Sequence, residues 1–183
     1  MDLFTGELLA LDLVNTRAAT SDGEADALDD AAGFTAWLAL QTHRLSPLPA
    51  MTRDDLPAVR ALREHVRQAL DAVRQGGTAP DAVAAINQAV RAAPPYRILA
   101  GDGTAETRRD GDALTCLLAQ LAEAAVDLLS SPDVERVRAC EGPHCRMLFL
   151  PAHPRRRWCS PTLCGNRVRV ARHHQRRKAA ERP

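Results

Sequence analysis

Four cysteines near the C-terminus form two pairs with the same internal spacing. Each pair encloses four residues, and 13 residues separate the pairs, which are made by Cys140, Cys145, Cys159 and Cys164. Two thiolate pairs that meet across a short hairpin could hold a zinc ion, because a tetrahedral site needs soft sulfur ligands from opposite sides. Four sulfur ligands leave no open coordination position, so this Zn2+ site would be structural rather than catalytic.

Disulfides between the same cysteines are the alternative. The apolar run at residues 8–11 is cut short by Asp12, so neither a signal peptide nor a transmembrane helix is expected. This predicts a cytoplasmic protein without membrane contact, and reduced thiols in that compartment favour zinc. His144 could replace a cysteine as ligand, but a histidine in such a turn is more often exposed.

Charge divides the chain into two halves of opposite sign. Residues 136–183 carry 13 arginines and lysines against two acidic residues, whereas the preceding 135 residues carry 11 basic and 21 acidic ones. A compact basic module of this kind is typical of proteins that bind nucleic acid phosphates. The residues expected to contact duplex DNA are Arg156, Arg157, Asn166, Arg167, Arg169, Arg172 and Arg176. Two alternatives remain: an adaptor whose basic module docks an acidic protein or RNA, and a solvated basic tail.

Capping residues and apolar periodicity predict a mainly α fold. Helices are expected at about 29–43, 52–75, 80–93 and 112–129, with a loop at 21–27 and a β-hairpin at 96–107. Residues 8–15 should form a short buried element, for which a helix is favoured over a strand. Strands at 134–139 and 146–150 should flank the first cysteine pair, and a basic helix at about 167–178 should follow the second. We therefore expect a helical domain with one small hairpin at residues 1–131. A zinc-ribbon-like or treble-clef-like module that ends in the basic helix should occupy residues 132–183.

Two sequence motifs resemble known families. The run Cys-Gly-Asn-Arg at 164–167, preceded by Arg-Arg-Trp-Cys-Ser at 156–160 and Leu-Phe-Leu at 148–150, resembles the CGNR zinc finger of proposed stress-induced bacterial transcription regulators. The segment Leu-Ala-Leu-Asp-Leu-Val-Asn-Thr at 9–16 resembles the opening motif of the ABATE domain that accompanies this finger. The turn Pro-Ala-His-Pro at 151–154 departs from the polar turn common in such fingers. The resemblance implies zinc binding, DNA binding and a role in transcription regulation.

The N-terminal domain is expected to serve in regulation, by sensing an effector or by forming a homodimer. Asn15, Arg17 and Arg63 could together hold a small anionic effector, although salt bridges to the many nearby acids are the preferred interpretation of such arginines. Trp158 could stack on a base, but packing against Phe149 in the core of the zinc module is favoured.

The sequence gives little support for an enzyme. It contains no glycine-rich phosphate loop, no H-E-x-x-H motif and no clear nucleophile–base pair. The closed cysteine quartet likewise favours binding over metal catalysis.

Overall fold

The computed structural model describes residues 6–20, 23–47 and 51–170 of the 183-residue chain. Its α-helices are α1 (Leu9–Val14), α2 (Ala31–Ala39), α3 (Leu56–Arg74), α4 (Pro80–Ala92) and α5 (Ala113–Leu129). Its strands are β1 (Arg17–Thr20), β2 (Gly23–Asp26), β3 (Tyr96–Leu99), β4 (Ala105–Arg108), β5 (Arg138–Ala139) and β6 (Leu148–Phe149). Two 3-10 turns, η2 (Arg53–Asp55) and η3 (Pro132–Arg136), and a π-helical turn, η4 (Pro161–Gly165), complete the list, and residues 166–170 are helical.

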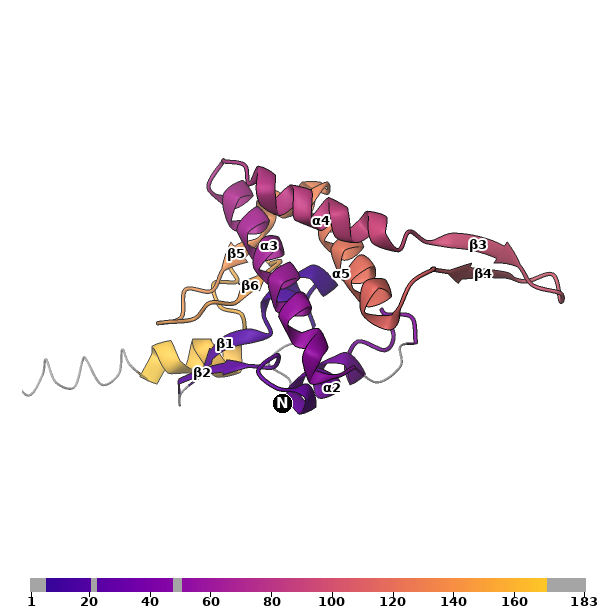
Figure 1. Ribbon diagram of the computed structural model, residues 1–183. Coiled ribbons are helices and arrows are strands. Elements are labelled where there is room, and N and C mark those ends of the chain that lie inside the picture. The colour runs from indigo at the N-terminus through magenta and orange to yellow at the C-terminus, as the bar shows by residue number, and fades with distance from the viewer. Residues whose placement is uncertain (1–5, 21–22, 48–50, 171–183) are drawn as a thin grey trace, which may run out of the picture.

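The helices α3, α4 and α5 form the body of the molecule (Figure 1). The expected capping box begins this body: the backbone N–H of Thr52 donates to the Asp55 carboxylate at 2.6 Å, and the Thr52 side chain contacts the same oxygen. Asp112 caps α5 by accepting from the backbone N–H of Thr115 at 2.7 Å. These local signals fixed the helix starts, so the sequence prediction of these helices is confirmed.

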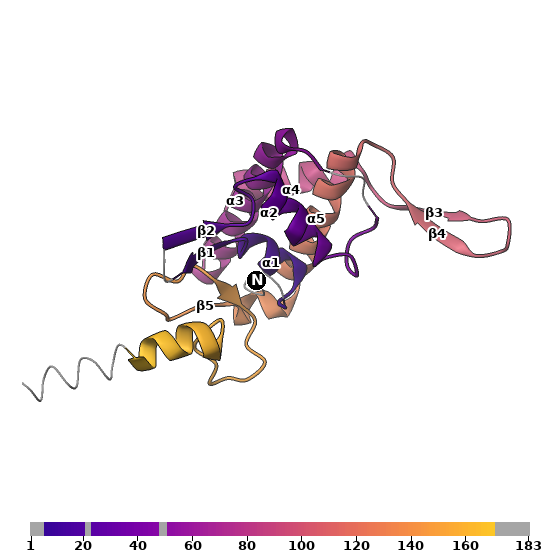
Figure 2. The same ribbon diagram turned by 90° about the horizontal axis from the view of Figure 1, so that it is seen from below.

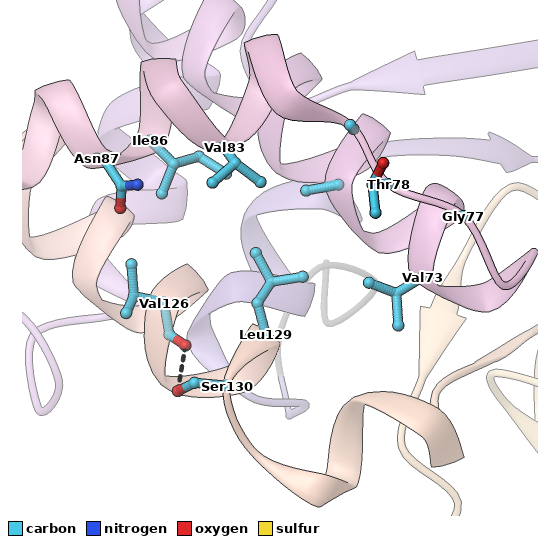
Figure 3. A pocket seen from close by; sticks show the side chains of 11 residues that line it. Val73, Gly77, Thr78, Val83, Ile86, Asn87, Val126, Leu129 and Ser130 are labelled. Carbon is cyan, nitrogen blue, oxygen red and sulfur yellow. Dashed lines mark hydrogen bonds between the residues drawn. The ribbon is translucent and has the colours of Figure 1, made fainter.

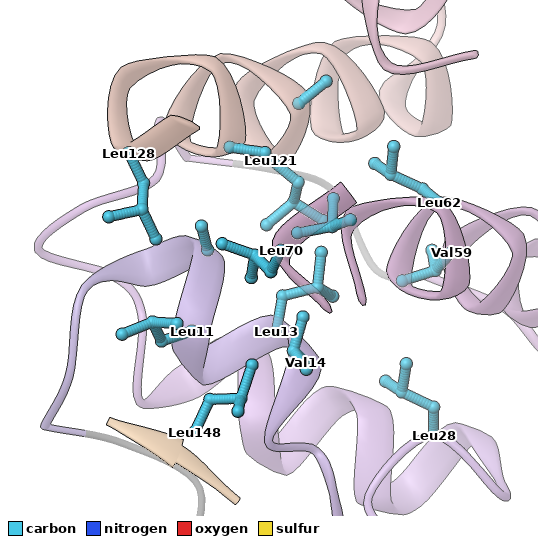
Figure 4. Packing of buried hydrophobic residues seen from close by; sticks show 14 of the residues in the cluster. Leu11, Leu13, Val14, Leu28, Val59, Leu62, Leu70, Leu121, Leu128 and Leu148 are labelled. Carbon is cyan, nitrogen blue, oxygen red and sulfur yellow. The ribbon is translucent and has the colours of Figure 1, made fainter. Parts of the chain in front are cut away.

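The short helix α1 lies at the centre of the core (Figure 4). Leu11 and Leu13 are fully buried, and they lie between the long helices α3 and α5 on one side and Leu148 of β6 on the other. A helix of six residues is not stable alone, so burial of its apolar side chains stabilises it here. The cluster continues without a break into Phe149 and Cys164. The core therefore crosses the expected junction near residue 131.

The strands form three separate antiparallel hairpins. The hairpin β3–β4 was predicted, and it projects away from the helical body (Figures 1 and 2). The hairpin β1–β2 was not: residues 21–27 were expected to form a loop, but 23–26 pair with 17–20. That prediction was wrong because Ala, Glu and Asp have low β propensity, and tertiary contacts overrode it. One such contact is the ion pair of the buried Arg63 with Asp26 at 2.6 Å.

The C-terminal part is smaller and less regular than the helical body. Residues 134–136, expected to begin a strand, belong to η3 instead, because Ser131 caps this turn by accepting from Asp133 N. The strands β5 and β6 pair as Arg138 with Phe149 and Ala139 with Leu148. Figure 2 shows the helix that starts at residue 166 standing clear of α3 to α5. Most of the expected basic helix, with Arg172 and Arg176, lies outside the described residues. Among the helices that the structure describes, none has the length and apolar character needed to cross a bilayer.

Candidate metal centre

The four cysteine sulfurs converge on one point. All four lie within 4.8 Å of one another. The Cys145 and Cys159 Sγ atoms are 3.8 Å apart, and those of Cys159 and Cys164 are 3.6 Å apart. Zn–S bonds of about 2.3 Å in a tetrahedron place the sulfurs about 3.8 Å apart. These two separations are close to that value, so the cluster suits a four-coordinate metal ion.

Local backbone features bring the sulfurs together. Cys140 follows β5, and the turn after it returns through Cys145, whose N–H donates to Gly142 O at 3.0 Å. Exposed His144 lies within this turn in the left-handed region at φ 59°, outside the sulfur cluster. Gly142 packs against the cluster: a Cβ there would lie 3.0 Å from Cys164 Sγ. Only glycine fits this position without moving a ligand.

The hydrogen bonds of the site favour negative charge on the Cys140 sulfur. Cys140 Sγ accepts from the backbone N–H groups of Gly142 at 3.4 Å and Cys159 at 3.3 Å. Hydrogen bonds from the thiols of Cys145 and Cys159 hold the pKa of Cys140 far below its usual range, and the same contacts raise the pKa of Cys145 and Cys159. A bound cation would displace the thiol protons and stabilise all four thiolates.

Comparison with known families divides the chain close to the end of η3. A model described as "Putative stress-induced transcription regulator", named ABATE, matches residues 7–132, and the CGNR zinc finger model matches residues 136–177. The chain belongs to the ABATE family. No curated protein matches the chain. Below, the ABATE region is residues 7–132 and the CGNR finger is residues 136–177.

The side chain of Asn15, in the ABATE motif, binds main-chain atoms of the CGNR finger. Its amide Nδ2 donates to Leu148 O at 2.7 Å, and its Oδ1 accepts from Leu148 N at 2.8 Å. Both residues are buried, at 1% and 0% exposure. Asn15 thus completes the hydrogen bonding of β6 on the side away from β5, in the place of a third strand. Spacing along the sequence gave no sign of this contact, since 133 residues separate the partners.

A second contact joins Glu7 to Arg156. The Glu7 carboxylate accepts from Arg156 Nη2 at 2.7 Å and from Leu150 N at 3.0 Å. The Arg156 guanidinium also donates to Cys159 O at 2.7 Å and lies 4.4 Å from the centre of the Phe149 ring. Arg156, expected to contact DNA, therefore points inward and connects the ABATE region to the cysteine cluster.

The basic residue Arg146 adds a third contact at the edge of the finger. Arg67 of α3 donates to Arg146 O at 2.7 Å, while the Arg146 guanidinium pairs with Glu24 of β2 at 3.2 Å. The hairpin β1–β2 thus has a role that the sequence did not reveal. Together with the two contacts above, this pairing attaches the finger to the ABATE region at three points.

The other residues nominated for DNA have different surroundings. Arg157 pairs with Glu141, and both side chains are about half exposed. Asn166 and Arg169 are exposed, and Arg167 is half-buried. Within the described part of the chain, Arg169 donates to Pro161 O over a long distance of 3.4 Å. Trp158 is partly buried and packs against the core cluster, in line with the expectation that it packs in the core rather than stacks on a base.

The residues nominated for an anion pocket each have a partner within the ABATE region or the finger. Asn15 binds Leu148, Arg17 pairs with Glu24 at 2.7 Å, and Arg63 donates to Thr16 Oγ1 at 2.9 Å as well as to Asp26. A cavity of about 320 Å³ lies elsewhere, between α3, α4 and α5 (Figure 3). Its lining is mostly apolar and contains no charged residue: Ala69, Val73, Gly77, Thr78, Ala79, Val83, Ile86, Asn87, Val126, Leu129 and Ser130.

Proposed function

We propose that this protein is a cytoplasmic, DNA-binding transcription regulator, in which a structural zinc ion held by the four cysteines supports the CGNR finger. The ABATE region regulates the finger, by sensing an effector or through dimerisation. One observation carries the proposal. The helix that begins at residue 166 follows directly from η4, the turn that bears Cys164. A metal ion at the cysteines would thus fix the start of the basic helix.

The distribution of charge supports DNA phosphate as the partner. Exposed Arg169 extends from the start of this helix, and exposed Asn166 stands at its first turn. Exposed Arg155 and Arg157 belong to the loop beside the cluster. Arginines on a rigid support bind phosphates with a smaller loss of side-chain entropy than arginines on a loose tail.

The metal is tested by elemental analysis of the purified protein. One zinc per chain is expected, and Cys159→Ser should lose it, because three thiolates hold zinc less well than four. As a matched control, Cys116→Ser replaces a cysteine outside the cluster and should keep the zinc. Protein purified under reducing conditions without bound zinc would contradict this part of the proposal.

DNA binding is tested by reversing charge on the helix. Arg169→Glu/Arg172→Glu should keep its zinc and thermal stability, yet lose affinity for duplex DNA because two attractive contacts become repulsive. Replacing both arginines with alanine should make the plot of log affinity against log salt shallower by roughly two units if each meets one phosphate. The double variant Arg53→Glu/Arg91→Glu makes the same charge change at exposed sites outside the finger and serves as control.

RNA and an acidic polymer serve as competitors in the same titration. Undiminished duplex binding by the Arg169→Glu/Arg172→Glu protein would remove this helix as the DNA surface. Equal loss in the control variant would show that only net charge matters.

A further inference from the structure

The ribbon β3–β4 adds nothing to the core of its own chain. Its main contacts are between its two strands, and both views show it extending away from the helices (Figures 1 and 2). Every residue of β4 is exposed, and Leu99 at the end of β3 is 77% exposed. A two-stranded ribbon alone in water is marginally stable, and its open edges present unpaired backbone groups. These properties indicate a partner for one edge.

The hydrogen bonding of the turn defines which groups of β4 face outward. Ala100 N donates to Thr104 O at 2.8 Å, so these two residues form a hydrogen-bonded pair. Because such pairs alternate with non-hydrogen-bonded pairs, Glu106 and Arg108 direct their backbone groups toward β3. The N–H and C=O groups of Ala105 and Thr107 therefore point to the open edge.

We propose that this edge pairs, antiparallel, with β4 of a second copy of the chain, about a two-fold axis at Thr107. Thr107 then lies opposite Thr107 of the second copy, and the outward N–H and C=O groups of both residues bond to each other. Glu106 lies opposite Arg108 of the second copy, and the reverse pair completes the symmetry. The pairing makes a four-stranded ribbon, β3–β4–β4–β3, with the two helical bodies at opposite ends.

Charge complementarity selects this edge and this register. In the single chain, Glu106 and Arg108 lie on one face and contact each other at 2.8 Å, with both side chains about half exposed. In the dimer they occupy non-hydrogen-bonded positions, where facing side chains approach most closely, and opposite charges stabilise such a pair. The edge of β3 has no such pairing of opposite charges, since a two-fold axis at Ile98 would place Arg97 opposite Leu99. The β4 edge is thus self-complementary, as a two-fold interface requires.

The size of the interface predicts a weak association. Four-residue strands bury far less than the roughly 1,000 Å² of a stable complex. The dimer should therefore depend on concentration, and it does not rely on DNA or on the proposed function. A regulator with two fingers would gain affinity from this pairing once both fingers meet one duplex, because the second contact is then intramolecular.

Sedimentation velocity on the full chain tests the pairing, from about 5 to about 500 µM, the range that a small interface requires. The parent should shift from monomer to dimer. Glu106→Arg or Arg108→Glu alone places like charges opposite each other twice and should raise the dissociation constant about tenfold or more. The double variant Glu106→Arg/Arg108→Glu restores opposite charges and should restore the dimer. Arg97→Glu, on the outer strand, is the control and should change little.

Disulfide formation tests the register. In zinc-loaded protein that carries Cys116→Ser, Thr107→Cys should cross-link to its copy under mild oxidation, since the two positions face each other across the axis. Ala105→Cys should not, because Ala105 lies opposite Arg109 of the second copy. A parent that stays monomeric throughout the range would overturn the proposal. So would a dimer that ignores the charge reversals, or one that cross-links equally at both positions.

Discussion

Replacing Asn15 by leucine removes both hydrogen bonds that join the ABATE motif to β6, while the number and branching of the side-chain heavy atoms are kept. The Leu148 N–H and C=O groups remain buried but lose their partners at 2.8 and 2.7 Å. Each unpaired backbone group costs about 1–3 kcal/mol, so the free energy of unfolding should fall by about 4 kcal/mol. In a protein of this size, that loss lowers the melting temperature by about 8–16 °C.

The assay is urea unfolding of the zinc-loaded protein, followed by circular dichroism and repeated with a zinc chelator. Asn15 binds the strand that precedes the second cysteine pair. The same variant should therefore bind zinc more weakly, with a dissociation constant raised up to tenfold for each 1.4 kcal/mol lost between the finger and the ABATE region. Asn87→Leu makes the same exchange at an exposed site on α4 and should change stability by less than about 0.5 kcal/mol. An Asn15→Leu protein as stable as this control would refute the inference that the amide holds the finger.

Three further outcomes follow from named contacts. Gly142→Ala should weaken zinc binding in a chelator competition, since its Cβ would lie 3.0 Å from Cys164 Sγ, whereas Gly101→Ala meets nothing within 4 Å and should not. The backbone N–H of Thr115 lowers the pKa of Asp112 below 3.8 in the folded protein. The stability that this cap adds is therefore present above pH 3.8 and is lost as the pH falls through the lower pKa of the folded state. Unfolding midpoints measured at decreasing pH should show this loss in the parent but not in Asp112→Asn, and an identical pH profile would argue against the cap. A fragment of residues 1–131 lacks Leu148 and Phe149, which cover α1. It should therefore unfold at a lower urea concentration than the full chain and bind a hydrophobic dye. A fragment as stable as the parent would support the domain boundary expected from the sequence.

Local signals in the sequence predicted the parts of the structure that local physics determines. The Thr52–Asp55 capping box and the Asp112 cap involve atoms three residues apart, so composition and spacing were enough to find them. The same is true of the cysteines, because two closely spaced pairs already limit where the sulfurs can go. Prediction was wrong at β2, where strand formation depends on pairing and on a contact from Arg63, 37 residues from its partner Asp26.

The attachment of the finger could not be predicted for the same reason. Arg156 belongs to a run of three arginines, which reads as a uniform basic loop. Its partner Glu7 is 149 residues away, and that carboxylate separates the inward Arg156 from the exposed Arg155. Nothing in the run itself distinguishes the two. The sequence therefore indicated a basic loop, but it did not indicate which of its arginines points inward.

The two hydrogen bonds between Asn15 and Leu148 have a consequence for how this protein can change in evolution. The amide contacts only main-chain atoms of Leu148, which every residue except proline offers in the same form. The side chain at position 148 can therefore vary, within the space of the core, without any compensating change at position 15. A comparison of related sequences that searches for correlated substitutions would miss this contact, although it joins the two halves of the chain. A finger of different sequence could be exchanged on the same ABATE region, provided that the new finger presents a strand of the same backbone geometry to the asparagine.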